Sequence, residues 1–326
     1  INAVQAETLM DIMEQPDEIV AHVNHVWANV GPDLRMLYIQ YSLALLIVLL
    51  VPSLNLCGLS NSRMQQRISE HPDALRGTVD FYPMLNPLGL DIGERLVPSG
   101  TRLDMNRAFP GSPNGTPLEY MCHQVIQDMR GADLVLDLHA SARNKGELYE
   151  VRVSAKEAER LLPRVRALCP QLIWVYPDKG SFSASLTGAL GAVGTDAVIL
   201  EADERRRLPQ EIAFSVVDGI FCKLKEMGIW TGDAIAAPDA SADIPIVRTS
   251  EDVCRVACEF PGVFVPEDCL GIHAEAGQVL GTVIDALDGV ARETVKAPCA
   301  GLVFSQRSYS SVYPGTLIAR IRKERA

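Results

Sequence analysis

Residues 133–145 of this 326-residue chain read DLVLDLHASARNK. Apolar residues at 134–136 and at 138 form a short run of the kind found in a central strand covered on both faces. Asp137 and His139 are two residues apart, so on a strand both side chains point to the same side. A polar pair where a strand meets a loop is a usual position for functional groups in α/β proteins. A histidine that is merely packed in the core is the alternative interpretation.

The composition is that of a globular protein that acts on small molecules. Apolar residues make up 48% of the chain and charged residues 22%, and the formal charge is −11. Such an acidic surface repels nucleic acid and anionic membranes, and no block of Lys and Arg reverses this locally. We therefore expect no nucleic-acid partner and no membrane partner, and we leave a homo-oligomer open.

The cysteines and the longest apolar run indicate the compartment. The eight cysteines form no C-x-x-C pair, so we expect buried thiols in a reducing compartment and no disulfides. The run LALLIVLLV at 43–51 is about half of the ~20 residues that span a bilayer, and Pro52 closes it. We expect a buried strand or a core helix there, and the cytoplasm as the default location.

From about residue 36 onward, apolar runs alternate with helix-like stretches, and the first 35 residues also have a helical pattern. We predict strands at Leu43–Val51, Gly77–Tyr82, Asp133–Leu138, Leu172–Tyr176 and Ala197–Leu200. We predict helices at Arg63–Ser69, Pro117–Met129, Ala155–Leu168, Ser183–Leu190 and Glu211–Met227. This alternation predicts an α/β domain with a parallel or mixed sheet and helices on both faces.

A second domain is indicated after Gly232. The stretch DAIAAPDASADIP at 233–245 has the Ala, Asp and Pro content of a linker. Beyond Val247, short β-rich segments recur between turn residues and the helical pattern is gone. We predict an α/β domain over 1–240 and a small all-β barrel-sandwich domain over 241–326.

Two further motifs carry polar residues. Asn106 and Arg107, within DMNR at 104–107, lie in a loop dense in Gly and Pro, where side chains are positioned rather than packed. An adjacent amide and guanidinium suit a carboxylate, although an arginine in a loop is usually just solvated. In AVILEAD at 197–203, Glu201 follows four apolar residues of a strand. A carboxylate there is paired, exposed in a cleft or functional, unless it is an ordinary polar strand end.

Together, and in this order, the three motifs resemble those of the succinylglutamate desuccinylase/aspartoacylase family, a branch of the zinc-carboxypeptidase-like hydrolases. DMNRAFPG at 104–111 is similar to the family's D-L-N-R-x-F-P-G loop. LDLHAS at 136–141 is similar to its D-L-H strand end, and ILEAD at 199–203 to its strand-end glutamate. The all-β segment resembles the biotinyl/lipoyl-like barrel at the C-terminus of many members. The resemblance extends from about Arg76 to the last residue.

The resemblance implies a zinc site with an acid–base glutamate. His139 resembles the third zinc ligand of the family, with Asp137 as a neighbour that orients a ligand. Glu201 resembles the general base and acid that takes a proton from the zinc-bound water and passes it to the leaving amine. Zinc in such a site lowers the pKa of the water and polarises the acyl carbonyl.

The resemblance also implies the substrate class. Asn106 and Arg107 resemble the pair that binds the free carboxylate of the substrate, and Arg102 or Arg95 would supply a further cation. The family therefore implies a zinc-dependent deacylase that hydrolyses an amide bond of a small N-acyl amino acid or a related carboxylate.

The sequence departs from the family at the first two zinc ligands, which come from an H-x-x-E motif in a loop after an early strand. The corresponding stretch, GLSNSR at 58–63, has Ser60 in place of the histidine and Arg63 in place of the glutamate. Neither is a zinc ligand, and a guanidinium repels the cation. Only His139 then matches a ligand position, so we expect little bound zinc and little amidase activity from the chain as written.

Three explanations of this departure stay open. The chain is a pseudoenzyme that binds a small carboxylate; or the sequence ahead of about residue 70 is not faithfully recorded; or other ligands complete the site. The other histidines ahead of His139 are His22, His25, His71 and His123. A biotin or lipoate carrier is a further candidate function, but the Ala-Pro that follows Lys296 is unlike a carrier's exposed hairpin tip.

Overall fold

The computed structural model describes residues 44–49, 54–83, 85–86, 89, 96–97, 103–140, 144–177, 182–202, 210–232 and 243–324. The expected helical pattern of the first 35 residues lies outside these ranges, as does the predicted domain boundary at 240/241.

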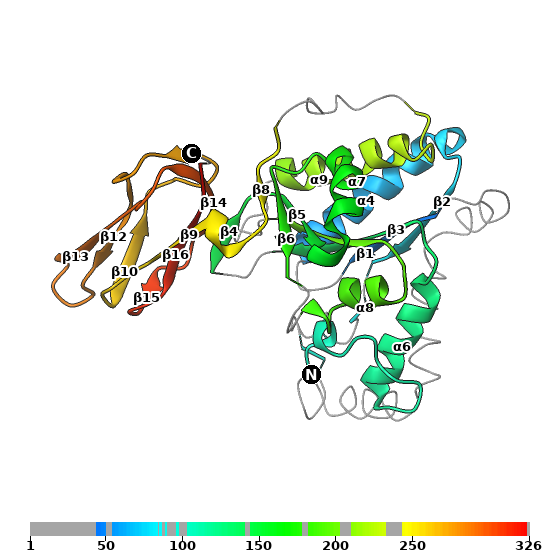
Figure 1. The fold of residues 1–326 in the computed structure, drawn as a ribbon, viewed down its shortest axis with the longest axis horizontal. Coiled ribbons are helices and arrows are strands. Elements are labelled where there is room, and N and C mark those ends of the chain that lie inside the picture. The colour runs from blue at the N-terminus through cyan, green and yellow to red at the C-terminus, as the bar shows by residue number, and fades with distance from the viewer. Residues whose placement is uncertain are drawn as a thin grey trace.

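A seven-stranded mixed sheet is the centre of the larger domain (Figure 1). Its order is β2-β1-β3-β7-β5-β6-β8, and β2, β1, β3 and β7 run parallel to one another. β5 is antiparallel to β7, and β6 and β8 follow the direction of β5. The bounds are β1 Ala44–Leu49, β2 Thr78–Tyr82, β3 Leu134–Ala140, β5 Glu150–Ser154, β6 Leu172–Tyr176, β7 Ala197–Ala202 and β8 Ile246–Val247. The five predicted strands are confirmed, whereas β5 and β8 were not predicted.

Helices cover both faces of this sheet, which confirms the predicted fold class (Figure 1). One face carries α4 (Leu54–Glu70), α7 (Ala158–Val165) and α9 (Gln210–Glu226). The other carries α6 (Pro117–Met129) and α8 (Leu186–Ala192).

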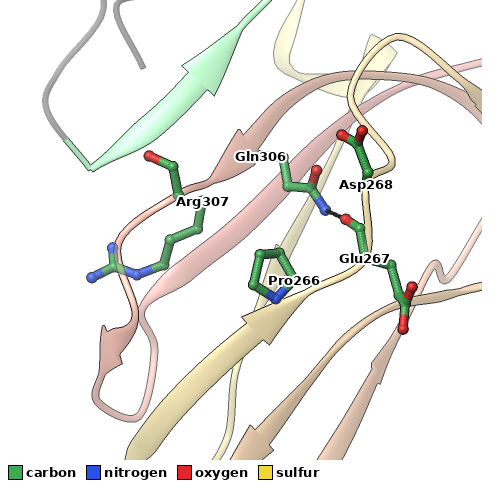
Figure 2. Close-up of a pocket in the computed structure, with 6 residues that line it drawn as sticks. Pro266, Glu267, Asp268, Gln306 and Arg307 are labelled. Carbon is green, nitrogen blue, oxygen red and sulfur yellow. Dashed lines mark hydrogen bonds between the residues drawn. The ribbon is translucent and has the colours of Figure 1, made fainter. Parts of the chain in front are cut away.

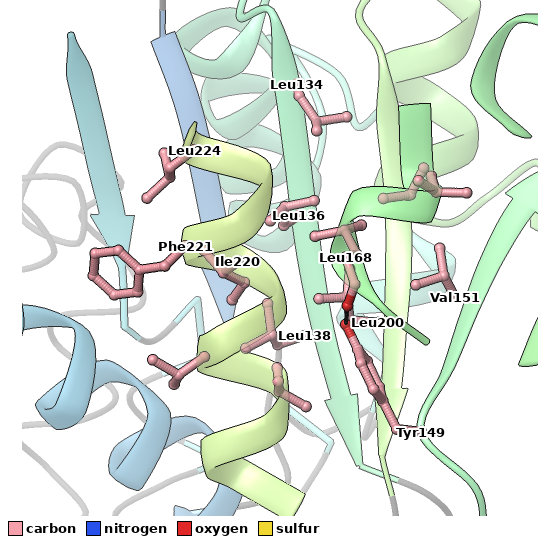
Figure 3. Close-up of a cluster of buried hydrophobic side chains, with 14 of the residues drawn as sticks. Leu134, Leu136, Leu138, Tyr149, Val151, Leu168, Leu200, Ile220, Phe221 and Leu224 are labelled. Atoms are coloured by element: carbon pink, nitrogen blue, oxygen red, sulfur yellow. Dashed lines mark hydrogen bonds between the residues drawn. The ribbon is translucent and has the colours of Figure 1, made fainter. Parts of the chain in front are cut away.

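Side chains of β3 alternate between the two faces of the sheet and so contribute to an apolar core on each face. Leu134, Leu136 and Leu138 are fully buried in one core, and Figure 3 shows Leu136 and Leu138 beside α9. Val135 points to the opposite face, into the core with α6 and α8. Because side chains alternate along a strand, Asp137 and His139 lie on this second face too.

The smaller domain consists of antiparallel strands, as predicted. One sheet has the order β13-β12-β10-β15 and the other β11-β14-β16-β9. The strands are β9 Val253–Ala257, β10 Gly262–Pro266, β11 His273–Ala274, β12 Val279–Ile284, β13 Ala291–Lys296, β14 Gly301–Arg307, β15 Ser311–Val312 and β16 Leu317–Lys323. Their inward side chains form a separate apolar core.

The two domains are joined by shared strand pairing. β4 (Lys145–Glu147), which directly precedes β5, pairs with β14 of the smaller domain. An apolar cluster lies beside this junction, where the rings of Trp174 and Phe304 meet edge to face at 5.3 Å between centroids. Among the described residues, none of the helices has the length and apolar character needed to cross a bilayer.

Candidate active site at the strand ends

Three neighbouring strands place polar side chains in one row. His139 of β3 is the register partner of Glu201 in β7, and Glu201 is in turn the partner of Glu150 in β5. Directly paired residues project to the same face of a sheet, and neighbouring strands are about 5 Å apart. The structure therefore brings the two predicted residues, His139 and Glu201, together on the face that α8 covers.

Asp137 and His139 form a close charge contact. Nε2 of His139 lies 3.0 Å from Oδ2 of Asp137, which is completely buried. The contact lacks the geometry of a hydrogen bond, and neither Asp137 oxygen has a hydrogen-bond partner among the described residues. Burial is the largest single influence on the pKa of His139 and lowers it, but the interactions with Asp137 and Glu201 together outweigh burial, so the net pKa is raised. The predicted association of Asp137 with His139 is present.

Glu201 pairs with an arginine, Arg152, that none of the three sequence motifs contains. Nη1 of Arg152 lies 2.7 Å from Oε2 of Glu201, whose side chain is only 7% exposed. Nε of Arg152 donates to Oε1 of Glu150 at 2.6 Å. Glu201 is therefore a buried carboxylate paired with a cation, not an ordinary polar residue at the end of a strand.

Arg152 lies between aromatic rings and carboxylates. Its guanidinium carbon is 5.2 Å from the ring centre of Tyr176 and 5.8 Å from that of Trp174. Burial disfavours its charge, but the carboxylates led by Glu201 and Glu150 outweigh burial and raise the pKa of Arg152 far above its ordinary value. This arginine therefore stays charged although it is buried.

The network continues into the smaller domain through Glu147. Its side chain is 1% exposed, and its Oε1 accepts from Lys145 at 2.6 Å and from Arg320 of β16 at 2.9 Å. Its Oε2 lies 3.6 Å from Nη2 of Arg152. We call the following set the ion-pair network: Lys145, Glu147, Glu150, Arg152, Glu201 and Arg320.

The predicted carboxylate pair is on the same side of the sheet. Oδ1 of the buried Asn106 accepts from the backbone N–H of Leu186 at the start of α8, at 2.9 Å. Arg107 is exposed and its Nη1 donates to the carbonyl of Asn106 at 2.5 Å. Over the described ranges, no hydrogen bond connects this pair to His139 or Glu201. Arg102 and Arg95 lie outside those ranges.

A glycine fixes the end of this loop. Gly111 has a φ of +73°, a conformation that other residues rarely adopt. A β-carbon at this position would collide with the carbonyl of Glu119 in α6. The loop that carries Asn106 and Arg107 can therefore pack closely on α6 only with glycine here.

Ser60 and Arg63 lie inside α4, not in a loop. Ser60 is fully buried and its Oγ has no hydrogen-bond partner among the described residues. Arg63 is exposed, with its guanidinium carbon 5.3 Å from the ring centre of Phe214 in α9. Apolar Met64 and Ile68, four residues apart, bury this helix against the core, which accounts for the helical conformation.

The described residues do not fit a zinc site. A catalytic zinc normally has three protein ligands. His139 and Asp137 carry atoms without hydrogen-bond partners, but no third ligand joins them: within the described ranges, no three His, Cys, Asp or Glu side chains could hold a metal ion. His71 lies in an exposed turn after α4 and His123 on α6, while His22 and His25 are not described.

A pocket of about 260 Å³ lies in the smaller domain (Figure 2). In its wall, Nε2 of Gln306 donates to the carbonyl of Glu267 at 2.6 Å. None of the residues expected at the active site lines it. The lining residues are Pro266, Glu267, Asp268, Gln306, Arg307 and Ser308.

The chain thus has an α/β domain with His139 and Glu201 paired at the ends of adjacent central strands, followed by a β domain. The sequence model of the succinylglutamate desuccinylase/aspartoacylase catalytic domain matches residues 62–225. The chain belongs to this family of deacylases, as its motifs indicated. The match begins within the stretch where the H-x-x-E motif is missing.

The individual relatives have low sequence identity to this chain. The chain is 27% identical over 259 residues to the N-alpha-acetyl-L-2,4-diaminobutyric acid deacetylase of Halomonas elongata, covering 76% of this chain and 72% of that protein. A Rhodobacter sphaeroides succinylglutamate desuccinylase/aspartoacylase structure is 20% identical, with a TM-score of 0.69 and 86% of each chain covered. The product-bound ectoine utilization protein EutE (DoeB) of Ruegeria pomeroyi also has a TM-score of 0.69, at 18% identity, covering 86% of this chain and 85% of that chain. The two structures share the fold.

Proposed function

We propose that this protein is an amide hydrolase of the deacylase type, which takes a small N-acyl amino acid or a related carboxylate. The observation that carries the proposal is the pairing of His139 with Glu201 on adjacent central strands of a domain that belongs to a deacylase family. The Halomonas relative, a deacetylase of an N-acetyl diamino acid, supports the substrate class.

In this proposal, each residue has a defined task. Glu201, held by Arg152, takes and returns the proton that must move from water to the leaving amine. Arg107 binds the carboxylate of the substrate, and the buried amide of Asn106 fixes the loop against α8. Asp137 orients His139 toward the same edge of the sheet.

Zinc is the family's expected cofactor, but it does not fit the residues that the structure describes. Ser60 and Arg63 cannot replace a histidine and a glutamate as ligands, and α4 directs Arg63 toward Phe214. We therefore assign no step to a metal.

The decisive experiment is an assay of acyl release combined with elemental analysis. The full chain is dialysed, its zinc content is measured, and it is incubated with N-α-acetyl-L-2,4-diaminobutyrate, N-acetylaspartate and N-succinylglutamate. Release of acetate or succinate that is lost in Glu201→Gln supports the hydrolase. A chain that binds none of these amides and releases no acid contradicts the proposal.

A second candidate is a small-carboxylate-binding protein without hydrolytic activity. The observation that favours it is the replacement of two family ligand positions by Ser60 and Arg63 inside a packed helix. It predicts calorimetric binding of one of the same N-acyl amino acids, with no acid released and no zinc retained.

Both candidates predict the same result for Arg107→Ala. We expect binding of the carboxylate compound to weaken by roughly 10- to 100-fold, because a charge-assisted hydrogen bond at an exposed position is lost. Titration calorimetry measures the change. Arg292→Ala in β13, also exposed, is the matched control and should bind as the parent chain does. Unchanged affinity in Arg107→Ala would remove Arg107 from the binding site.

A further inference from the structure

We infer that Arg152 is a positioning residue for Glu201, and that the smaller domain takes part in this positioning through Arg320 and Glu147. The inference rests on the proposed function, because it concerns the carboxylate to which that function assigns proton transfer. It makes the smaller domain a component of the active site.

The first step is the geometry around Arg152. Three of its nitrogens have different carboxylates: Nη1 contacts Glu201 at 2.7 Å, Nε contacts Glu150 at 2.6 Å, and Nη2 lies 3.6 Å from Glu147. A planar guanidinium that donates one hydrogen bond and lies between three carboxylates has a restricted orientation, which a flexible ammonium cannot reproduce. The position of the Glu201 carboxylate is therefore defined by a group that is itself fixed.

The second step is the link to the smaller domain. Glu147 is in β4, which pairs with β14, and Arg320 is in β16, the next strand of that sheet. Arg320 binds Oε1 of Glu147 while Oε2 of the same carboxylate faces Arg152. One buried carboxylate thus lies between an arginine of the smaller domain and the arginine that holds Glu201.

The third step is the shared aromatic surface. The guanidinium carbons of Arg152 and Arg320 lie 5.8 Å and 5.5 Å from the ring centre of Trp174. Phe304 of the smaller domain contacts the same ring edge to face. The side chains of Arg152 and Arg320 are only 15% and 18% exposed, so solvent screens their charges weakly. A shift of the smaller domain would displace Arg320 and Phe304 and so change the surroundings of Arg152.

The first test observes Arg152 directly and needs no activity. The full chain is labelled with ¹⁵N-arginine, and the Nε–H signal of Arg152 is assigned by its loss in Arg152→Lys. We expect this signal to move in Glu201→Gln, in Glu147→Gln and in Arg320→Met. The matched control, Arg292→Met, removes an exposed arginine of β13 that also contacts two carboxylates. If Arg320→Met moves the signal no more than Arg292→Met does, the inference is wrong.

The second test uses the rate of acyl release. We expect Arg152→Met to lower kcat roughly 100-fold with little change in KM, because misplacement of a catalytic group by about 1 Å costs about that much. Arg152→Lys should recover part of kcat, and Arg320→Met should lower kcat by a smaller factor. An active chain whose kcat is unchanged in Arg152→Met contradicts the inference. A chain with no acyl release at all contradicts the proposed function, and the arginine signal still decides the inference.

Discussion

Replacing Arg152 with methionine is expected to lower the free energy of unfolding by about 3–5 kcal/mol, the usual cost of removing one partner of a buried ion pair. The variant leaves Glu150 and Glu201 buried without their cation, at 0% and 5% exposure. Urea denaturation at pH 8 measures the loss. Arg292→Met should change stability little, because its ion pairs are exposed.

A second substitution separates charge from packing in this result. If unpaired carboxylates cause the loss, adding Glu150→Gln to Arg152→Met should recover part of the stability, since one buried negative charge is removed. If the double variant is as unstable as Arg152→Met, or less stable, the loss comes from the packing of the arginine stem on Trp174 and Tyr176. That outcome would contradict the electrostatic explanation.

Glu150→Gln alone is expected to remove a pH dependence of stability. Burial raises the pKa of Glu150 to about 7 from 4.5, with Arg152 opposing and Glu147 and Glu201 adding to the rise. The folded chain therefore retains a proton that the unfolded chain releases. The stability from this proton is complete below pH 4.5 and is lost as the pH rises through 7, a change on the order of 3 kcal/mol.

Urea denaturation at several pH values between 5 and 8 measures this effect. The parent chain should lose stability over that interval relative to Glu150→Gln, which cannot ionise. At pH 8 the amide variant should be the more stable of the two, provided that it keeps the hydrogen bond from Arg152. Parallel pH profiles for the two proteins would show that Glu150 is ionised throughout.

The strands that could be predicted from the sequence are those whose own residues form an apolar run. Buried parallel strands such as β3 and β7 are nearly continuous apolar runs, so each is visible without knowledge of its neighbours. Strand β5 reads EVRVS, and its charged residues suggested no buried strand. Its charges, Glu150 and Arg152, are tolerated because they pair with each other and because further partners come from β7 and β4. Arg320 and Glu147 are 173 residues apart, a distance at which no local pattern operates.

The same distinction applies to the candidate site. His139 and Glu201 were predicted because each ends an apolar run, and strand pairing brings them together. Arg152 was missed because nothing near it in the sequence marks it as buried. The alternation of charged and apolar residues in EVRVS at 150–154 was the one available signal. The resemblance placed Ser60 in a loop, whereas the structure has it in helix α4. Burial of Met64 and Ile68 against the core favours a continuous helix there.

The pairing of β4 with β14 has a consequence for the order in which the chain folds. During synthesis, β4 and Glu147 are made long before β14 and Arg320, so an edge strand and an acidic side chain must wait for their partners. Contacts between residues so far apart in sequence form slowly, because the intervening chain must be ordered first. We therefore expect the surroundings of Glu201 to be completed among the last events of folding, after both apolar cores have formed. Until then, the nascent protein has its central sheet, but Glu147 lacks its ion pair with Arg320.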